Sequence, residues 1–512
     1  MSRTNRFLGG ISFGYASQIL TTLVAFWLTP FLLHRIGTHD YGLWLVGTQL
    51  MFYLGLMDFG IIALLPRETA FATGRSPSIA EAADVPLIVG QTTRIVLAQL
   101  PLVAIAAIVA WFLMPAEWAG LRHPIALILL TFVLTFPLRI FGAVLQGLQD
   151  FAFVGRMGII SYLASTVVTV ALILFGWGLY SLAIGWVVLQ FAVAAAGWYR
   201  LRTHFPGILP RGLPKLPWSV ARVRLRQGFW VSLNQIAQVL LNGTDILVIG
   251  KFFGPAAVVP YAITGKLISV LANQPQMLVQ LAGPGLSQMR MGESRERLSQ
   301  VCIALGQAML MLSGGVVCVV LIVNQGFVSR WVGANQFGGL LLTALILLGM
   351  LLRHWNLTVG IALFSLGYER RLCLTGLLDG LVSFGSMLIF IRVYGLIGAP
   401  LGTIMGACLV SLPANLIALA KESRSTVLAL VRPLMPWFAR FILLLLAGGA
   451  VARIWTPRTW PLLALTGACG ALAYVAAMFP LALRAPLGAY IRPRLLPIRA
   501  RFFRALHLSD PA

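Results

Sequence analysis

Long apolar runs recur along the whole chain and are separated by short polar segments. Most runs have about twenty residues or more, the length that an α-helix needs to cross about 30 Å of hydrocarbon. The strict alternation of polar and apolar positions that is typical of membrane β-barrels does not occur. The pattern therefore predicts an all-α polytopic membrane protein of about 14 transmembrane helices, near residues 11–34, 41–65, 95–115, 124–146, 157–177, 179–199, 228–250, 258–284, 301–323, 338–366, 373–393, 398–420, 435–453 and 460–483.

The composition agrees with a lipid environment for most of the chain. Of the 512 residues, 59% are hydrophobic and 10% are charged, whereas soluble domains carry about 25% charged residues. The first apolar run is too long for a cleavable signal peptide and lacks a small-residue cleavage site. We therefore expect this run to be the first span.

Basic residues are distributed unevenly between the two sides of the predicted bundle. The chain has 38 Lys and Arg against 14 Asp and Glu, a net charge of +24. With 14 spans both termini lie on one side, which collects 27 basic residues, whereas the other side has 7 and the spans have 4. An excess of Lys and Arg marks the cytoplasmic side. We expect an inner-membrane protein with both termini in the cytoplasm, anionic lipids as partners and no binding of nucleic acid.

A basic, proline-rich segment divides the predicted bundle. It contains seven basic residues, four prolines and no acid. The expected order is an N-terminal lobe of six spans, a cytoplasmic linker, a C-terminal lobe of six spans, two further spans and a basic cytoplasmic tail, over residues 1–199, 200–227, 228–420, 421–484 and 485–512 respectively.

The two predicted lobes begin in a similar way. Each opens with a long span, then a turn with glycine, then a span led by tyrosine: Gly14–Leu33, Gly37 and Tyr41 in the first lobe, and Gly228–Gly250, Gly254 and Tyr261 in the second. Duplicated lobes are typical of alternating-access transporters. Chance similarity between two membrane hairpins is the alternative.

Polar side chains inside the spans are the most informative functional signal, because a charge at the bilayer centre costs about 2.5–3.5 kcal/mol on insertion scales. At 100° per residue, the span 228–250 places five such residues within roughly 100°: Asn234, Gln235, Gln238, Asn242 and Asp245. The span 258–284 places Lys266, Ser269, Asn273, Gln276 and Gln280 within roughly 80°. Other spans carry Thr131, Thr135, Arg139 and Gln146 on one face, Arg353, and the acids Asp58 and Asp379.

These side chains predict a hydrated cavity for a polar substrate. Amides both donate and accept hydrogen bonds and therefore suit sugar hydroxyls, whereas Arg and Lys suit a diphosphate. Interhelical hydrogen bonding is the structural alternative. The three acids Asp58, Asp245 and Asp379 have two possible roles: pairing with an intramembrane cation, which we favour slightly, or coupling of transport to a proton or sodium ion.

The sequence contains no recognisable catalytic or cofactor motif. HExxH, P-loop, GxSxG and dinucleotide glycine patterns do not occur, and the five cysteines lie in apolar runs without a CxxC pair. We expect no cofactor, no metal site and no enzymatic activity. A membrane-embedded envelope polymerase or ligase is a weaker alternative, because the predicted external loops are no longer than about 15 residues.

Two stretches of the chain resemble a known family. Residues 30–37, 40–44 and 55–60, together with Arg67, are similar to the beginning of bacterial polysaccharide-biosynthesis flippases of the multidrug/oligosaccharidyl-lipid/polysaccharide exporter superfamily. Residues 245–254, followed by Tyr261, are similar to the beginning of the second lobe in that family.

The resemblance implies a V-shaped pair of lobes that carries undecaprenyl-diphosphate-linked oligosaccharide from the cytoplasmic to the periplasmic leaflet. It implies that amides face the glycan and that Arg67, Arg139, Lys266 and Arg353 attract the diphosphate. A polysaccharide polymerase and glycosyltransferases would be further partners in O-antigen, exopolysaccharide or capsule synthesis. A cation-coupled multidrug exporter of the same superfamily is the alternative, and it predicts an acidic lumen.

Overall fold

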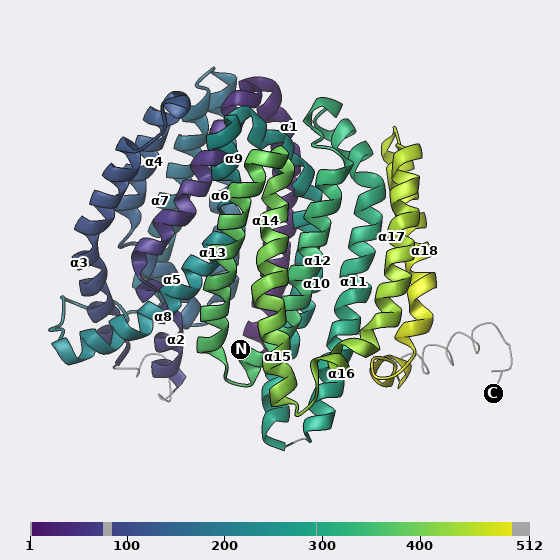
Figure 1. Cartoon of the computed structure of the whole chain (residues 1–512). Coiled ribbons are helices and arrows are strands. Elements are labelled where there is room, and N and C mark those ends of the chain that lie inside the picture. Colours follow the sequence, from purple (N-terminus) through teal and green to yellow (C-terminus); the bar gives the residue numbers. More distant parts are fainter. Residues whose placement is uncertain (1–2, 75–83, 293, 494–512) are drawn as a thin grey trace, which may run out of the picture. The chain divides into compact units, whose positions relative to one another are not determined.

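The computed structural model describes residues 3–74, 84–292 and 294–493 of the chain. Helices joined by short turns make up this part of the protein, and no strand occurs in it (Figure 1). The predicted all-α polytopic class is therefore confirmed. Residues 75–83, between the predicted spans 41–65 and 95–115, residue 293 and residues 494–512 of the predicted basic tail lie outside the described residues.

The chain forms two compact units, Met1–Val259 and Pro260–Ala512. The boundary between the units lies at residues 259–260, so the segment 228–250, which we assigned to the C-terminal lobe, belongs to the first unit. The division of the chain at residues 200–227 stays a prediction. The first unit contains α1 (Arg3–Gly55), η1 (Leu56–Asp58), α2 (Ile61–Gly74), α3 (Asp84–Phe112), η3 (Ala116–Leu121), α4 (Arg122–Thr135), α5 (Arg139–Gly147), α6 (Phe151–Leu174), α7 (Leu179–His204), α8 (Trp218–Asn242) and α9 (Asp245–Phe253).

The second unit is built on the long helix α10, which begins at the end of the first unit. Its elements are α10 (Pro255–Gly292), α11 (Arg295–Trp331), η4 (Ala334–Gln336), α12 (Leu340–Ser365), α13 (Glu369–Tyr394), η5 (Gly395–Ile397), α14 (Gly398–Gly406), the π-turn η6 (Ala407–Ser411), α15 (Leu412–Glu422), α16 (Val427–Val431), η7 (Arg432–Leu434), α17 (Met435–Ile454) and α18 (Trp460–Ala482).

Eleven segments of the described chain are long and apolar enough to cross a membrane, or twelve if α8 and α9 count as one bent span. Two of these segments, Ser17–Asp58 and Glu369–Glu422, each contain two of the predicted spans. The predicted count of 14 is reached only when both segments are divided at their turns and the bent pair is included.

The segment Ser17–Asp58 reverses direction at Gly37. This residue has φ of 81° and ψ of 169°, a conformation that glycine adopts without steric cost. The hydroxyl oxygens of Thr29 and Tyr41 lie 3.5 Å apart, although twelve residues of uninterrupted helix would separate them by about 18 Å. The two halves of α1 are therefore two spans joined by a tight turn (Figure 1).

A stripe of small residues lets α14 approach α13 closely. Gly398, Gly402 and Gly406 recur every four residues on one face of α14. A Cβ atom on Gly402 would lie 2.6 Å from the Cβ atom of Met387 on α13. Close backbone approach of this kind is a main source of helix association in lipid, where dispersion contacts replace the hydrophobic effect.

We expect the substitution Gly402→Val to lower stability by about 1–3 kcal/mol, because overpacking forces the two backbones apart. Gly385→Val on α13 is the matched control, since nothing lies within 4 Å of its added Cβ atom. Thermal unfolding of the two purified variants in detergent measures the difference. Equal midpoints for both variants would contradict a close-packing role for the stripe.

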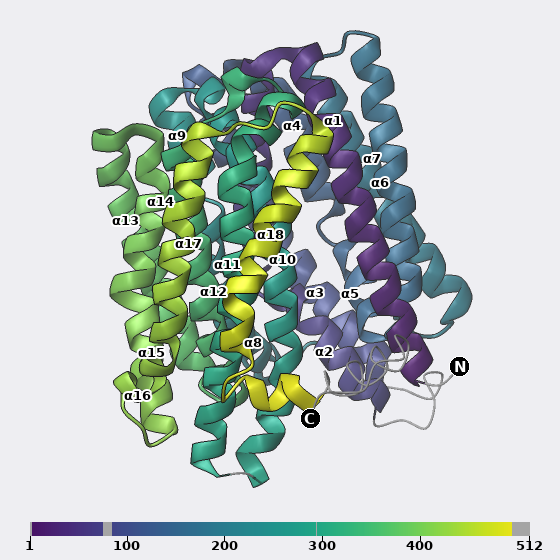
Figure 2. The same ribbon diagram turned by 90° about the vertical axis from the view of Figure 1, so that its right-hand side faces the viewer.

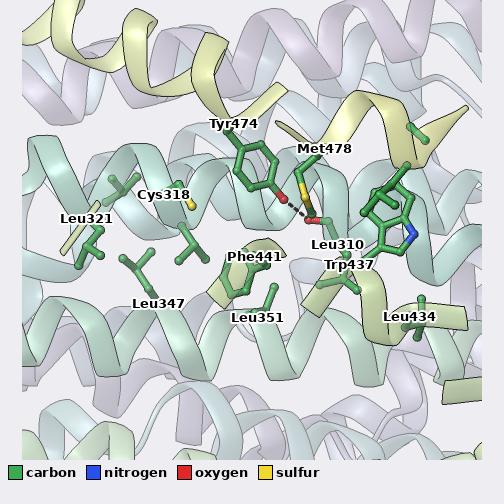
Figure 3. Close-up of a cluster of buried hydrophobic side chains, with 14 of the residues drawn as sticks. Leu310, Cys318, Leu321, Leu347, Leu351, Leu434, Trp437, Phe441, Tyr474 and Met478 are labelled. Atoms are coloured by element: carbon green, nitrogen blue, oxygen red, sulfur yellow. Dashed lines mark hydrogen bonds between the residues drawn. The ribbon is translucent and has the colours of Figure 1, made fainter. Parts of the chain in front are cut away.

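The buried part of the second unit centres on α11, which packs against α12, α17 and α18 (Figure 2). Figure 3 shows Tyr474 of α18 with its hydroxyl donating to the carbonyl oxygen of Leu310 at 2.9 Å. A Cβ atom on Gly314 would overlap this hydroxyl. Gly314 on α11 thus leaves room for the hydroxyl of the buried Tyr474 to form a hydrogen bond with the backbone of α11.

The segment 205–217, between α7 and α8, lies against α3 and sets the position of α8. Arg224 near the start of α8 is nearly buried, and its guanidinium donates to the hydroxyl of Thr92 at 2.8 Å and pairs with Glu68 at 3.6 Å. Gly90 leaves room for Pro214 of the connecting segment. These contacts tie α8 to α2 and α3, and so place its polar face beside them.

Candidate functional site in the first unit

Three predicted spans of the first unit are interrupted. The helix that ends at Gly55 is separated from α2 by η1, Phe59 and Gly60, whereas α4 and α5 are separated by residues 136–138. Helices α8 and α9 meet at a bend of 47°. Interrupted spans are typical of transporter binding sites, because backbone groups freed at a break require polar surroundings.

The prediction of continuous spans at 41–65, 124–146 and 228–250 is wrong at these breaks. Hydrophobic periodicity does not detect the first two breaks, because the residues on both sides keep the run apolar. The third break falls at residues 242–245, where polar and glycine residues are a turn signal that the prediction of a continuous polar arc overlooked. The second of the 14 spans also extends to Gly74 rather than to residue 65. Asp245 begins α9 and therefore does not continue the polar arc of α8.

A cavity of about 480 Å³ lies inside the first unit. Its wall comes from η1, α2, the junction of α4 and α5, α7 and α8. Six of its lining residues are polar: Asp58, Thr135, Arg139, Gln146, Gln190 and Gln235. Two of the helix breaks thus bring an acid and an arginine, 81 positions apart in the sequence, to one polar space.

Asp58 is oriented by the turn that contains it. The residue is 2% exposed, and its Oδ1 atom accepts a hydrogen bond from the N–H group of Gly60 at 2.9 Å. Its carbonyl oxygen accepts from Nε2 of Gln99 at 3.4 Å. Gly60 has φ of 69°, and a Cβ atom there would lie 2.6 Å from the carbonyl oxygen of Gly228. The carboxylate is therefore a fixed acceptor in the cavity wall.

Arg139 is the first residue of α5, and its side chain is exposed in the cavity. The guanidinium lies 5.9 Å from the ring centroids of both Phe132 and Phe136. These cation–π contacts orient the charge without using its N–H groups. Within the described chain the side chain forms no hydrogen bond and no ion pair within 4 Å, although its charge interacts at longer range with the carboxylate of Asp58. Five N–H donors therefore remain available to an anion.

Three glutamine amides complete the polar part of the cavity: Gln146, Gln190 and Gln235. None of these amides has a hydrogen-bond partner among the described residues, and the Oε1 atom of Gln235 is buried. A buried polar atom without a partner costs about 1–3 kcal/mol. The arrangement thus leaves both donors and acceptors for a hydroxylated ligand. Gln190 is not among the residues predicted from the sequence, because it is a lone polar residue in an apolar stretch of α7 and belongs to no polar arc.

The other predicted amides of α8 lie outside this set of lining residues. Asn234, Gln238 and Asn242 are exposed at four-residue spacing, and Nδ2 of Asn242 donates to Oε1 of Gln238 at 3.2 Å. Asp245 is the first residue of α9, and its Oδ1 atom accepts a hydrogen bond from the N–H group of Ile246 at 2.9 Å. A carboxylate is stabilised at a helix N-terminus. Contact of these four residues with substrate stays a prediction.

In the second unit Arg353 forms a bidentate ion pair with Asp379. One of its Nη atoms also donates to the hydroxyl of Ser383 at 3.1 Å and to the carbonyl oxygen of Thr403 at 3.2 Å. Asp379 is fully buried and accepts a further hydrogen bond from Ser383 at 3.0 Å. Pairing, one of the two roles considered for the acids, is the arrangement at Asp379. Binding of diphosphate by Arg353 stays a prediction and would compete with this pair.

Gln276 takes part in a buried chain of hydrogen bonds. Its Nε2 atom lies 3.1 Å from Nε2 of His354, and Nδ1 of His354 lies 2.7 Å from the hydroxyl of Ser313. The hydroxyl proton of Ser313 points to the sulfur of Met309 at 3.1 Å. The ring therefore donates from Nδ1 and accepts at Nε2, as a neutral imidazole does. This chain joins α10, α11 and α12.

Four predicted binding residues remain without a side-chain partner in the described part of the protein. Lys266 and Asn273 are half-buried on α10, whereas Gln280 on α10 and Arg67 on α2 are exposed. Their role in substrate binding stays a prediction. No group of three or more His, Cys, Asp or Glu residues that could hold a metal ion occurs in the ranges that the structure describes.

Comparison with known proteins agrees with the expected family. Residues 89–335 match the family described as "Polysaccharide biosynthesis protein". The match includes the second of the two resembling stretches, residues 245–254, and confirms the expected resemblance to a polysaccharide-biosynthesis family. No curated protein sequence matches the chain.

The fold is also that of solved membrane transporters. A multidrug resistance MATE family transporter of the MOP superfamily, in an inward-facing conformation, superposes with a TM-score of 0.58 at 12% identity, over 80% of this chain and 95% of the transporter. The lipid II flippase MurJ, in an inward closed conformation, superposes with a TM-score of 0.63 at 12% identity, over 93% of this chain and 100% of MurJ. At these identities the likeness establishes the fold.

Proposed function

We propose that this chain, which matches the family described as "Polysaccharide biosynthesis protein" over residues 89–335, is a flippase for polyprenyl-diphosphate-linked oligosaccharide. The observation that carries the proposal is the cavity of the first unit, in which the unpaired guanidinium of Arg139 stands among three unpaired amides. A guanidinium recognises phosphate oxygens through parallel N–H donors. Amides recognise sugar hydroxyls because they donate and accept.

The charges in this cavity favour an anionic substrate over an organic cation. Its acid, Asp58, already accepts a backbone hydrogen bond and is 2% exposed, whereas Arg139 is exposed and its guanidinium forms no hydrogen bond in the described structure. A cation exporter would need available carboxylates at this position. The likeness to a lipid II flippase supports a lipid-linked saccharide as substrate, whereas the likeness to a multidrug transporter keeps a drug exporter as the alternative outcome of the experiment below.

The proposed direction is from the cytoplasmic to the periplasmic leaflet of the bacterial inner membrane, with both termini in the cytoplasm as the basic residues indicate. With a negative cell interior, outward movement of an anion is favoured by about 2.3 kcal/mol per charge per 100 mV. The membrane potential alone can therefore drive export of a diphosphate. The protein changes the location of its substrate and forms no covalent bond, so no cofactor is required.

Leaflet exchange in liposomes tests the proposal. The purified protein is reconstituted with a fluorescent polyprenyl-diphosphate saccharide, and the label in the outer leaflet is quenched with and without an imposed potential. We expect exchange that is faster than in protein-free vesicles and that responds to the sign of the potential. Absence of exchange, together with uptake of an organic cation by the same vesicles, would instead establish the drug exporter.

A further inference from the structure

A second hollow of the first unit lies between α3 and α4 and is apolar. It has a volume of about 400 Å³ and is lined by Ala104, Ala107, Ile108, Trp111, Phe112, Ala126, Leu129, Leu130 and Val133. Ala107 and Leu129 are buried, whereas Ile108, Phe112 and Leu130 are exposed at the surface of the two helices. Both helices belong to segments that are long and apolar enough to cross a membrane. A hollow of this kind in a membrane span is filled by hydrocarbon.

A cation marks one end of this hollow, which we call the α3–α4 groove. The guanidinium of Arg122 lies 4.7 Å from the ring centroid of Trp111, and Nε1 of Trp111 donates to the carbonyl oxygen of Arg122 at 3.0 Å. Arg122 is exposed and forms no ion pair among the described residues, including with Glu117 of the preceding turn. Tryptophan and arginine at the end of a span are typical of the level of lipid headgroups. The groove therefore ends at a fixed positive charge.

The length of the groove fits a single lipid chain. From Ala104 to Phe112 the helix rises about 12 Å at 1.5 Å per residue, whereas one leaflet is about 15 Å deep, half of a hydrocarbon core of about 30 Å. An acyl chain that fills the groove would bring its phosphate to the level of Arg122. A polyprenyl chain that spans both leaflets would extend beyond the groove on the side away from Arg122.

We infer that the α3–α4 groove binds one acyl chain of an anionic phospholipid, whose phosphate contacts Arg122. The apolar lining selects hydrocarbon, and the guanidinium selects negative charge at one end. The groove shares no lining residue with the cavity that contains Arg139, so this inference does not depend on the proposed transport function. The bound lipid would contact both α3 and α4. It would thereby stabilise α4 next to its interruption at residues 136–138.

Photochemical labelling tests the inference with the full-length protein. Vesicles of phosphatidylcholine and phosphatidylglycerol contain phosphatidylglycerol with a photoreactive acyl chain, and mass spectrometry maps the labelled residues. We expect labelling of the groove at least fivefold above that of the exposed lipid-facing residues Leu465 and Leu472 of α18. Filling the groove by Ala104→Phe or Ala126→Phe should reduce its labelling at least fivefold and leave α18 unchanged.

The charge is tested by a substitution on the surface that leaves the groove intact. Arg122→Gln should reduce labelling by phosphatidylglycerol at least threefold, whereas the matched control Arg453→Gln, an exposed arginine near the end of α17, should not. Labelling as strong on α18 as in the groove, or labelling unaffected by Arg122→Gln, would overturn the proposal. Preferential labelling by a photoreactive polyprenyl phosphate would also overturn it and would identify a different occupant.

Discussion

Replacing Arg139 by alanine is expected to reduce leaflet exchange of a polyprenyl-diphosphate saccharide at least tenfold. A hydrogen bond to a charged group contributes about 1.5–3 kcal/mol, and about 1.4 kcal/mol corresponds to a factor of ten. The side chain forms no hydrogen bond within the described structure. The thermal unfolding midpoint of the variant is measured beside the exchange rate, which separates a loss of binding from a loss of folding.

Replacing Arg139 by lysine tests whether the shape of the cation matters in addition to its charge. Arg139→Lys keeps the charge but loses the planar fork of donors, so exchange should fall between the wild-type and alanine values. Arg458→Ala, which removes an exposed arginine outside the cavity, should leave exchange unchanged. An Arg139→Ala variant with wild-type exchange would show that the cavity cation does not bind the substrate.

Replacing Asp379 by alanine is expected to be among the most destabilising single changes in the second unit. Removal of one partner from a buried ion pair costs about 3–5 kcal/mol, because the other charge remains in a site of low polarity. Arg353 would keep its hydrogen bonds to Ser383 and Thr403 but lose its counter-charge. The thermal unfolding midpoint in detergent should fall by several degrees.

A double substitution distinguishes loss of the pair from loss of packing. In Asp379→Ala with Arg353→Met the uncompensated charge is removed, so at least half of the lost stability should return. Asp40→Ala is the matched control, since Asp40 pairs with His39 on the exposed surface and such pairs contribute at most about 1 kcal/mol. A double variant no more stable than Asp379→Ala would contradict a role of the pair in stability.

Hydrophobic runs predict the helices because lipid requires long apolar segments with satisfied backbones. The same runs do not predict where a helix is interrupted. Phe59 has φ of 46° and Gly60 has φ of 69° in the turn after Asp58, yet the sequence around them is as apolar as a continuous span. The bend between Asn242 and Asp245 differs, because Gly243 lies at the break and Thr244 is held by a hydrogen bond of 2.8 Å to Tyr53.

The sequence predicts which polar residues lie inside the spans, but it does not predict which of them contact one another. The cost of burying polar groups in lipid singles out Asp58, Arg139 and Gln235, and the structure places all three on one cavity. Helical periodicity does not show that Arg353 and Asp379, on different helices, pair with each other. Periodicity within one helix carries no information on contacts between helices.

Protection of a reporter cysteine in the cavity tests the central claim most directly. In a variant whose five native cysteines are replaced by alanine, Gln190→Cys places a thiol beside the cavity that contains Arg139, and its reaction with a maleimide is timed in liposomes. We predict that a polyprenyl-diphosphate saccharide slows this reaction at least fivefold, whereas the polyprenyl alcohol without phosphates does not. An unchanged rate with the diphosphate saccharide, in vesicles where leaflet exchange proceeds, would contradict the assignment of the substrate to this cavity.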